Sequence, residues 1–168
     1  MKKTIQIITG LLLVLVAGVF WGTWFSLSRT MDRLPPEIFI IIGKEIMQNV
    51  AVVMSIIMPA SIVGLITLMV GSWKVRSVYF YCIIVSLILS AIALLITVGI
   101  EVPIDNQIKT WSKQTMPSNW QNIRGRWQWY HTIRTFSSLS AVILFLVAII
   151  KQSPGYGIAR NTDPPGSG

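Results

Sequence analysis

The sequence predicts an all-α protein: a four-helix transmembrane bundle with a polar, partly helical segment between its third and fourth helices. Two observations lead to this prediction, the apolar composition and the clustering of polar residues after the third apolar run. Of the 168 residues, 53% are hydrophobic and only 12% are charged. A water-soluble core of this size has no room for so much apolar surface. We therefore expect an integral membrane protein.

Four apolar runs are long enough to cross a bilayer, which takes about 20 residues per helix. We expect membrane spans at about residues 5–25, 50–71, 78–100 and 136–151. Helices are expected because lipid offers the backbone no hydrogen-bond partners. The first run follows Lys2 and Lys3 as in a signal peptide, but it continues into Trp21 and Trp24 without a small-residue cleavage site. We expect this helix to be retained in a single domain of residues 1–151.

The ends of the chain give a prediction of location. Four spans place both termini on one side of the membrane, and the N-terminal lysines favour the cytoplasm, although the opposite face carries more basic residues. We expect an integral protein of the bacterial inner membrane with cytoplasmic termini. Residues 152–168 are rich in Pro, Gly and Ser and are expected to form a flexible tail, in part an appended expression sequence.

Composition also excludes several functions. The net charge of +8 is spread over loops at both faces without a nucleic-acid-binding module, so we expect contact with lipid headgroups and no nucleic acid. Cys82 is the only cysteine, which excludes an internal disulfide or a thiol redox pair. No span carries a charged residue near its middle, which weighs against an ion-coupled transporter. The oligomeric state is not predicted.

The polar segment, residues 101–135, contains two stripes. Glu101 and Asp105 are four residues apart and share one face if the third helix continues past the membrane. The second stripe lies on one side of a helix leading into the fourth span and consists of Arg124, Trp127, His131 and Arg134. If the stripes meet, the arginines neutralise the acids. The alternative, equally open, is a salt-bridged cap that only seals the bundle.

The chemistry of these residues allows acid-base catalysis. His131 exchanges a proton near neutral pH, and Glu101 or Asp105 can orient it or act as the base. The same three residues are ligand types of a non-haem iron site, but nearby arginines oppose a cation, so a metal is the minority hypothesis. Glu45 and Gln48, near the start of the second span, either face water or point into the bundle.

The polar segment resembles a known family. The residues that carry the resemblance are 102–108, Trp111, Pro117, Trp120, 124–127, His131 and 134–135. This pattern is similar to the anthrone oxygenase-like family of small four-span membrane proteins, long catalogued as a domain of unknown function. The chain has Glu101 and Asp105 where the family pattern commonly has asparagines.

The resemblance implies an integral membrane oxidoreductase that acts with molecular oxygen on a hydrophobic aromatic or quinone-like substrate from the bilayer. It implies a cofactor-independent oxygenase, with a metal-assisted one as the alternative. The catalytic set would be His131, Glu101, Asp105 and Arg134. With the two polar residues of the second span included, the substrate-binding set would be Asn106, Trp111, Trp120, Arg124, Trp127, Glu45 and Gln48. A non-catalytic protein stays open as well, in which a 101–134 cap binds a lipid, a small ligand or a partner subunit.

Overall fold

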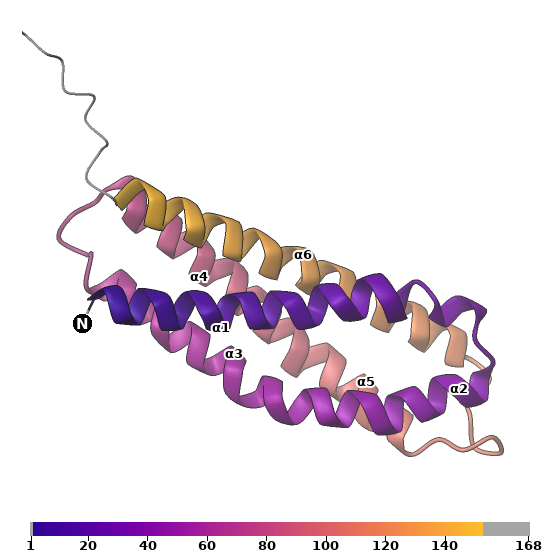
Figure 1. Ribbon diagram of the computed structural model, residues 1–168. Coiled ribbons are helices and arrows are strands. Elements are labelled where there is room, and N and C mark those ends of the chain that lie inside the picture. The colour runs from indigo at the N-terminus through magenta and orange to yellow at the C-terminus, as the bar shows by residue number, and fades with distance from the viewer. Residues whose placement is uncertain (1, 153–168) are drawn as a thin grey trace, which may run out of the picture.

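The computed structural model describes residues 2–152, which contain helices and connections and no strand (Figure 1). The α-helices are α1 (Lys2–Gly22), α2 (Pro36–Ile41), α3 (Met47–Val70), α4 (Val78–Ile96), α5 (Val102–Lys109) and α6 (Trp120–Gln152). Three π-helical segments and one 3-10 turn complete them, namely η1 (Thr23–Ser28), η2 (Met31–Arg33), η3 (Ile42–Ile46) and η4 (Thr97–Glu101).

Several of these elements join into longer helices. Four helical segments are long and apolar enough to cross a membrane, and they are Lys2–Ser28, Pro36–Val70, Val78–Lys109 and Trp120–Gln152. Their outer faces are apolar and exposed, as lipid contact requires. The predicted all-α architecture with four transmembrane helices is confirmed.

The polar segment is more helical than the sequence predicted. Pro103 lies in the first turn of α5, where a proline costs no backbone hydrogen bond, so the third helix continues to Lys109. The helix that contains the fourth span begins at Trp120, so the second polar stripe lies on a helix leading into this span, as its spacing predicts. Only residues 110–119 of the segment are non-helical. The predicted tail lies outside the described residues, apart from Gln152, which ends α6.

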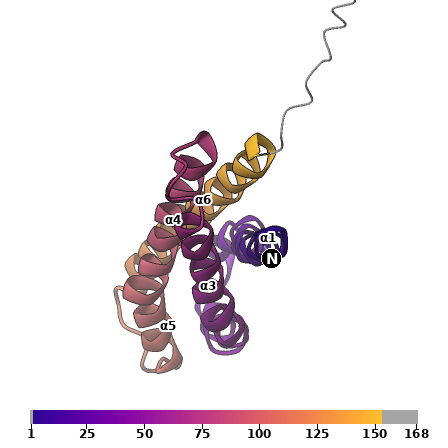
Figure 2. The same ribbon diagram turned by 90° about the vertical axis from the view of Figure 1, so that its left-hand side faces the viewer.

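The four long helices form a closed ring. Helix α1 packs on α3 and α6, and α4 packs on α3 and α6. The start of α1, the α3–α4 connection and the end of α6 lie at one end of the bundle, while α2 and α5 lie at the other (Figure 1). The view along the bundle shows α4 beside α6, with α3 between α4 and α1 (Figure 2).

Two kinds of contact hold the helices together. Small residues allow close approach: a Cβ atom added to Gly64 of α3 would lie 2.3 Å from Thr9 Oγ1 of α1. Hydrogen bonds also cross between helices, and Ser86 Oγ of α4 donates to the Ala141 carbonyl of α6 at 2.9 Å. Both are typical of membrane bundles, where packing and polar contacts take the place of the hydrophobic effect.

Three of the four long helices contain a π-helical segment, and each segment lies toward the end of the bundle that carries α2 and α5. Segments η3 and η4 lie within their helices, and η1 ends the first one. A π-helical turn adds a residue to the helix and turns the following side chains, and it is frequent at functional sites. Two of these segments, η1 and η4, border the cavity described below.

Candidate functional site

Three ionisable side chains are buried together beside the π-helical segment η4. Glu101, the last residue of η4, and His131 on α6 are fully buried, and Arg134, one turn beyond His131, is 8% exposed. Burial of charged groups is costly unless they are paired. The contacts within the cluster therefore decide what it can do.

Arg134 connects the members of the cluster. Its Nη2 atom lies 3.0 Å from Glu101 Oε2, which makes a buried ion pair between α6 and η4. Its Nε and Nη2 atoms lie 3.0 and 2.8 Å from His131 Nδ1. Nη1 donates to Thr97 Oγ1 at 3.2 Å, and the guanidinium lies over the Phe20 ring at 4.5 Å. Arg134 thus joins three of the four long helices.

The contact with Arg134 fixes the protonation of His131. A guanidinium only donates hydrogen bonds, so Nδ1 must accept, and the imidazole is neutral with its proton on Nε2. Among residues 2–152, Nε2 is buried and has no hydrogen-bond partner. A buried donor without an acceptor is costly. The Nε2–H group of His131 can therefore donate to a hydrogen-bond acceptor that enters the cavity.

Trp127 holds His131 and Asp105 in place. Its ring stacks on the imidazole, with the centroids 4.9 Å apart and 8° between the planes. Its Nε1–H group donates to Asp105 Oδ1 at 3.1 Å, across from α6 to α5. One indole therefore orients two ionisable side chains.

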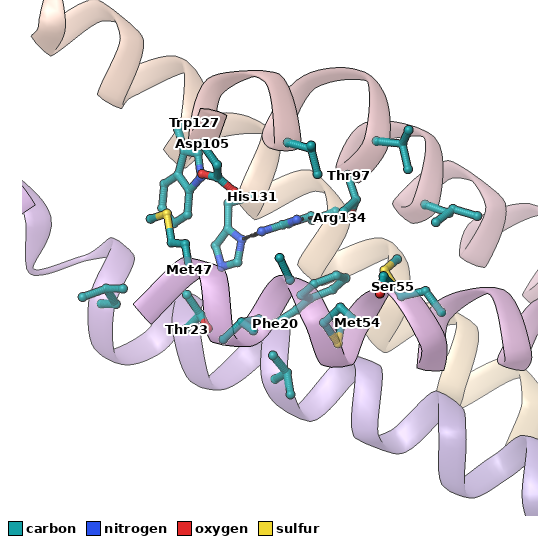
Figure 3. A pocket seen from close by; sticks show the side chains of 18 of the residues that line it. Phe20, Thr23, Met47, Met54, Ser55, Thr97, Asp105, Trp127, His131 and Arg134 are labelled. Atoms are coloured by element: carbon teal, nitrogen blue, oxygen red, sulfur yellow. Dashed lines mark hydrogen bonds between the residues drawn. The ribbon is translucent and has the colours of Figure 1, made fainter. Parts of the chain in front are cut away.

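These residues form the polar wall of a cavity of about 230 Å³ (Figure 3). Asp105, His131 and Arg134 line it, and Trp127 and Thr97 lie beside them. The rest of the wall is largely apolar and includes Phe20, Leu27, Met47, Met54, Met58 and Leu94. Such a composition, apolar with a few convergent polar groups, is typical of a small-molecule site.

The predicted catalytic set is thus brought together, with one difference in position. Asp105, His131 and Arg134 face the cavity, whereas Glu101 is not part of its lining and contacts Arg134 instead. The two polar stripes of the sequence do meet. Glu101 contacts the guanidinium, and the other three side chains face the cavity.

The arrangement does not fit a metal ion held by Glu101, Asp105 and His131. No three His, Cys, Asp or Glu side chains converge on a common point within the described part of the chain. The guanidinium of Arg134 contacts both Glu101 and His131, and it takes the Nδ1 lone pair of the imidazole. A cation would have to displace a positive charge.

Most of the predicted substrate-binding residues do not line the cavity. Trp127 does, but Asn106, Glu45 and Gln48 are exposed, and the Asn106 side chain accepts a hydrogen bond from Lys109 at 3.2 Å. Arg124 donates from Nη1 to the Met31 carbonyl at 3.0 Å and lies over the Trp120 ring. Arg124, which lies over Trp120, thus connects α6 to Met31 in the connection between the first two long helices.

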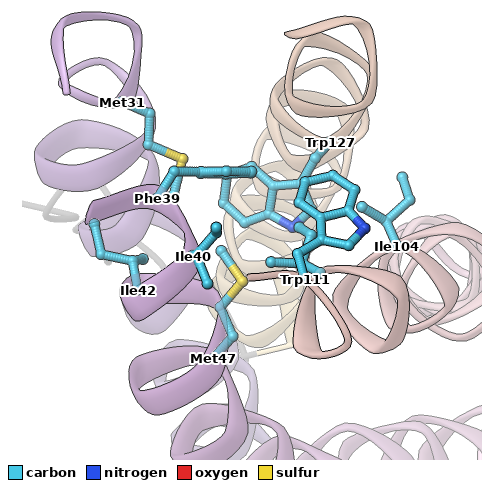
Figure 4. Packing of buried hydrophobic residues seen from close by; sticks show 9 residues of the cluster. Met31, Phe39, Ile40, Ile42, Met47, Ile104, Trp111 and Trp127 are labelled. Carbon is cyan, nitrogen blue, oxygen red and sulfur yellow. The ribbon is translucent and has the colours of Figure 1, made fainter. Parts of the chain in front are cut away.

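Trp111 belongs to an apolar cluster between the cavity and the loops, which we call the cap cluster (Figure 4). It consists of Met31, Phe39, Ile40, Ile42, Met47, Ile104, Ile108, Trp111 and Trp127. Met47 and Trp127 also line the cavity, so the cap cluster forms its floor on the loop side. Trp111 therefore supports the site without facing it.

Sequence reasoning missed the residues that complete the wall from other helices. Phe20 of α1 lies against both Arg134 and His131, and its ring is edge-on to the imidazole at 6.1 Å. Met54 of α3 faces the cavity from the opposite side. Both look like ordinary apolar residues of a membrane span, and no signal in the sequence distinguishes them.

The comparison with protein families gives one match. The family model described as anthrone oxygenase matches residues 44–144, a range that contains Asp105, Trp127, His131 and Arg134. No curated protein and no solved structure matches the chain.

Proposed function

Since this chain belongs to the anthrone oxygenase family, we propose that it is an integral membrane oxygenase acting on a flat, hydrophobic, aromatic or quinone-like ketone. The observation that carries the proposal is the cavity wall itself. A carboxylate, a hydrogen-bond donor and a guanidinium, from Asp105, His131 and Arg134, face one apolar cavity. These are the groups needed to make and hold a carbanion.

Asp105 is the proposed general base. Its Oδ1 atom accepts the Trp127 hydrogen bond, which orients the carboxylate toward the cavity and leaves Oδ2 for a proton of the substrate. His131 is not assigned as the base, because its Nδ1 lone pair is engaged by Arg134. The proton acceptor is therefore on α5 and the donor is on α6.

His131 and Arg134 are the proposed oxyanion site. When a CH₂ group between two aromatic rings loses a proton, the electron pair moves onto the ketone oxygen at the far side of the central ring. The Nε2–H of His131 can donate to that oxygen, and the Arg134 charge stabilises it. Glu101 holds Arg134 in position through the ion pair.

The reaction balances with molecular oxygen as the only oxidant. The carbanion transfers electrons to O₂ and forms a carbon–oxygen bond, and protonated Asp105 returns its proton to give a hydroperoxide. Asp105 then removes the second proton from the same carbon, and the oxygen–oxygen bond breaks. One oxygen atom remains as the new carbonyl, and the other leaves as hydroxide, which takes the proton and becomes water.

The proposal places the protein in the bacterial inner membrane with both termini in the cytoplasm. The N-terminal lysines, Lys2 and Lys3, are the basis of this orientation, although the opposite end of the bundle carries more basic residues in total. A cytoplasm-dependent reporter fused after Gln152 tests it, and activity only in a periplasm-dependent reporter would reverse the orientation.

The experiment uses the purified protein in lipid nanodiscs with membrane-dissolved anthrone and ¹⁸O₂. Wild type is expected to consume one O₂ per anthrone and to give anthraquinone with one labelled atom, faster than protein-free nanodiscs. Asp105→Asn should lower the rate by about a hundredfold or more, the contribution typical of a general base. The matched control is Glu37→Gln, an exposed carboxylate paired with Lys113, which should keep the wild-type rate.

The competing candidate is a non-catalytic protein in which the same cavity binds a hydrophobic ligand. The ion pair and the cap cluster suit this equally, because both seal a cavity without chemistry. The same nanodisc preparation separates the two candidate functions. Saturable binding of anthraquinone, together with oxygen uptake no faster than in protein-free nanodiscs, would favour the binding protein over the oxygenase.

A further inference from the structure

The most exposed lining residues of the cavity lie on one side of it. Elsewhere the lining is buried or half-buried, and Phe20, Trp127 and His131 are each at most 2% exposed. Its rim on α3 and on the third long helix is exposed, with Val98 at 61%. The exposed residues of the rim are Ala51, Ser55, Pro59, Val98 and Val102. The opening therefore lies between α3 and η4, on the outer surface of the bundle.

The cavity is closed toward the loops. The cap cluster lies between the cavity and the connections 29–35 and 110–119, and Met31, Phe39 and Ile108 in it are fully buried. Figure 4 shows Met31, Phe39, Ile40 and Met47 on one side of this cluster and Trp111 with Trp127 on the other. A ligand has no path through this packing from the aqueous side.

The rim presents an apolar surface. Of its five residues only Ser55 has a polar side chain, and its hydroxyl donates to the Val52 carbonyl of its own helix at 2.7 Å. A hydroxyl satisfied in this way adds little polarity to the surface. The opening thus faces lipid, and it offers no group that would attract a charged molecule.

The depth of the opening in the bilayer follows from an aromatic group at the same level of the bundle. Trp21 stacks on Trp24 and Phe25, immediately after the cavity residue Phe20, and Trp24 contacts Phe136. Trp21, Phe25 and Phe136 are exposed. Exposed tryptophans of this kind mark the membrane interface. The cavity, lined by Phe20, Thr23 and Leu27, lies at the level of this interface.

We propose that the gap between Ala51 and Ser55 of α3 and Val98 and Val102 on the facing helix is a lateral portal that admits an uncharged, flat aromatic ketone from the lipid. This inference rests on the proposed function for the identity of the ligand. Such a portal selects substrates that dissolve in the membrane, and it excludes analogues that carry a fixed charge.

The test fills the portal with a large side chain. Ala51→Trp and Val98→Trp are compared with Val63→Trp, which replaces a lipid-facing valine that is also 61% exposed but does not line the cavity. Binding of anthraquinone added to nanodiscs is followed by stopped flow, and oxygen uptake with anthrone is measured separately. The portal variants should slow association by about tenfold or more, and Val63→Trp should match wild type.

A second ligand tests the route. Anthraquinone-2-sulfonate has the same ring system with a fixed negative charge, and it should not bind to wild type in nanodiscs. Portal variants with wild-type association rates, or tight binding of the sulfonate from water, would overturn the portal. If the portal variants slow anthraquinone association but wild type takes up no oxygen, the portal is supported and the oxygenase is refuted. If wild type takes up oxygen and the portal variants do so at the same rate, the oxygenase is supported and the portal is refuted.

Discussion

The indole of Trp127 lies parallel to the imidazole of His131, 4.9 Å from it, while its N–H group donates to Asp105. The proposed donor and the proposed base are therefore held by one side chain and cannot drift apart independently. Preorganisation of this kind is what makes a few polar groups effective in an apolar site. The roles of the ring and of the N–H group can be separated by substitution.

Trp127→Phe keeps an aromatic ring against His131 and removes the hydrogen bond to Asp105. We expect the rate of anthrone oxidation to fall about tenfold, equivalent to roughly 1.4 kcal/mol, with little change in anthraquinone affinity. Trp127→Leu also removes the stacking and should weaken binding as well. Steady-state oxygen uptake and equilibrium binding measure the two effects. A wild-type rate in Trp127→Phe would show that the Asp105 hydrogen bond has no part.

The Glu101–Arg134 pair predicts a specific pattern of stability. Glu101→Gln leaves a buried guanidinium without its counter-charge, and Arg134→Met leaves a buried carboxylate, so each should destabilise the fold by about 3–5 kcal/mol. The double variant removes both charges and should cost less than the sum of the two. Thermal unfolding in detergent measures all three proteins. Additive losses would mean that the two charges do not interact.

The sequence was sufficient to predict the fold and the composition of the polar wall. Four apolar runs predicted four long helices, and helical spacing placed Asp105, His131 and Arg134 on faces that do meet. Periodicity works on α6, which carries Trp127, His131 and Arg134, because a regular α-helix turns by a constant angle per residue.

The sequence was insufficient wherever the outcome depended on which helix packs against which. Glu101 and Asp105 are equivalent in the sequence pattern, and only the position of Arg134 directs one to the ion pair and the other to the cavity. Trp111 and Trp127 are likewise both tryptophans of the polar segment, but one packs in the cap cluster alone and the other also faces the cavity. Three-dimensional packing decides these roles.

Helix α1 approaches α3 closely at Gly64. A Cβ atom there would lie 2.3 Å from Thr9 Oγ1 and 3.1 Å from Thr9 Cβ, so Gly64→Ala must force the helices apart. We expect a loss of about 1–3 kcal/mol in unfolding free energy, as for other overpacked sites. Gly18→Ala, with open space around its Cβ, is the control and should be neutral or slightly stabilising. A Gly64→Ala protein with wild-type melting behaviour would argue against this α1–α3 contact.

The contact between Gly43 and Ile108 leads to a prediction about how water is excluded from the floor of the cavity. Gly43 lies in η3 and Ile108 in α5, and a Cβ atom at Gly43 would lie 2.5 Å from Ile108 Cγ2 but 3.5 Å from Ile108 Cβ. Gly43→Ala should push η3 away from α5 and admit water through the cap cluster, because backbone and a buried side chain oppose each other there.

The companion substitution makes this prediction specific. Ile108→Ala alone leaves a void and should cost about 2–5 kcal/mol in unfolding free energy. In the double variant the new Cβ at Gly43 occupies the space of the lost Cγ2 of Ile108. It then meets only the remaining Cβ of the shortened side chain, at an ordinary distance. The loss of unfolding free energy in the double variant should therefore be smaller than the sum of the losses in the two single variants. Hydrogen exchange of amides in α5 reports water entry, and it should rise in Gly43→Ala and fall back in the double variant. Exchange that rises equally in both would mean that the contact between Gly43 and Ile108 does not control water entry.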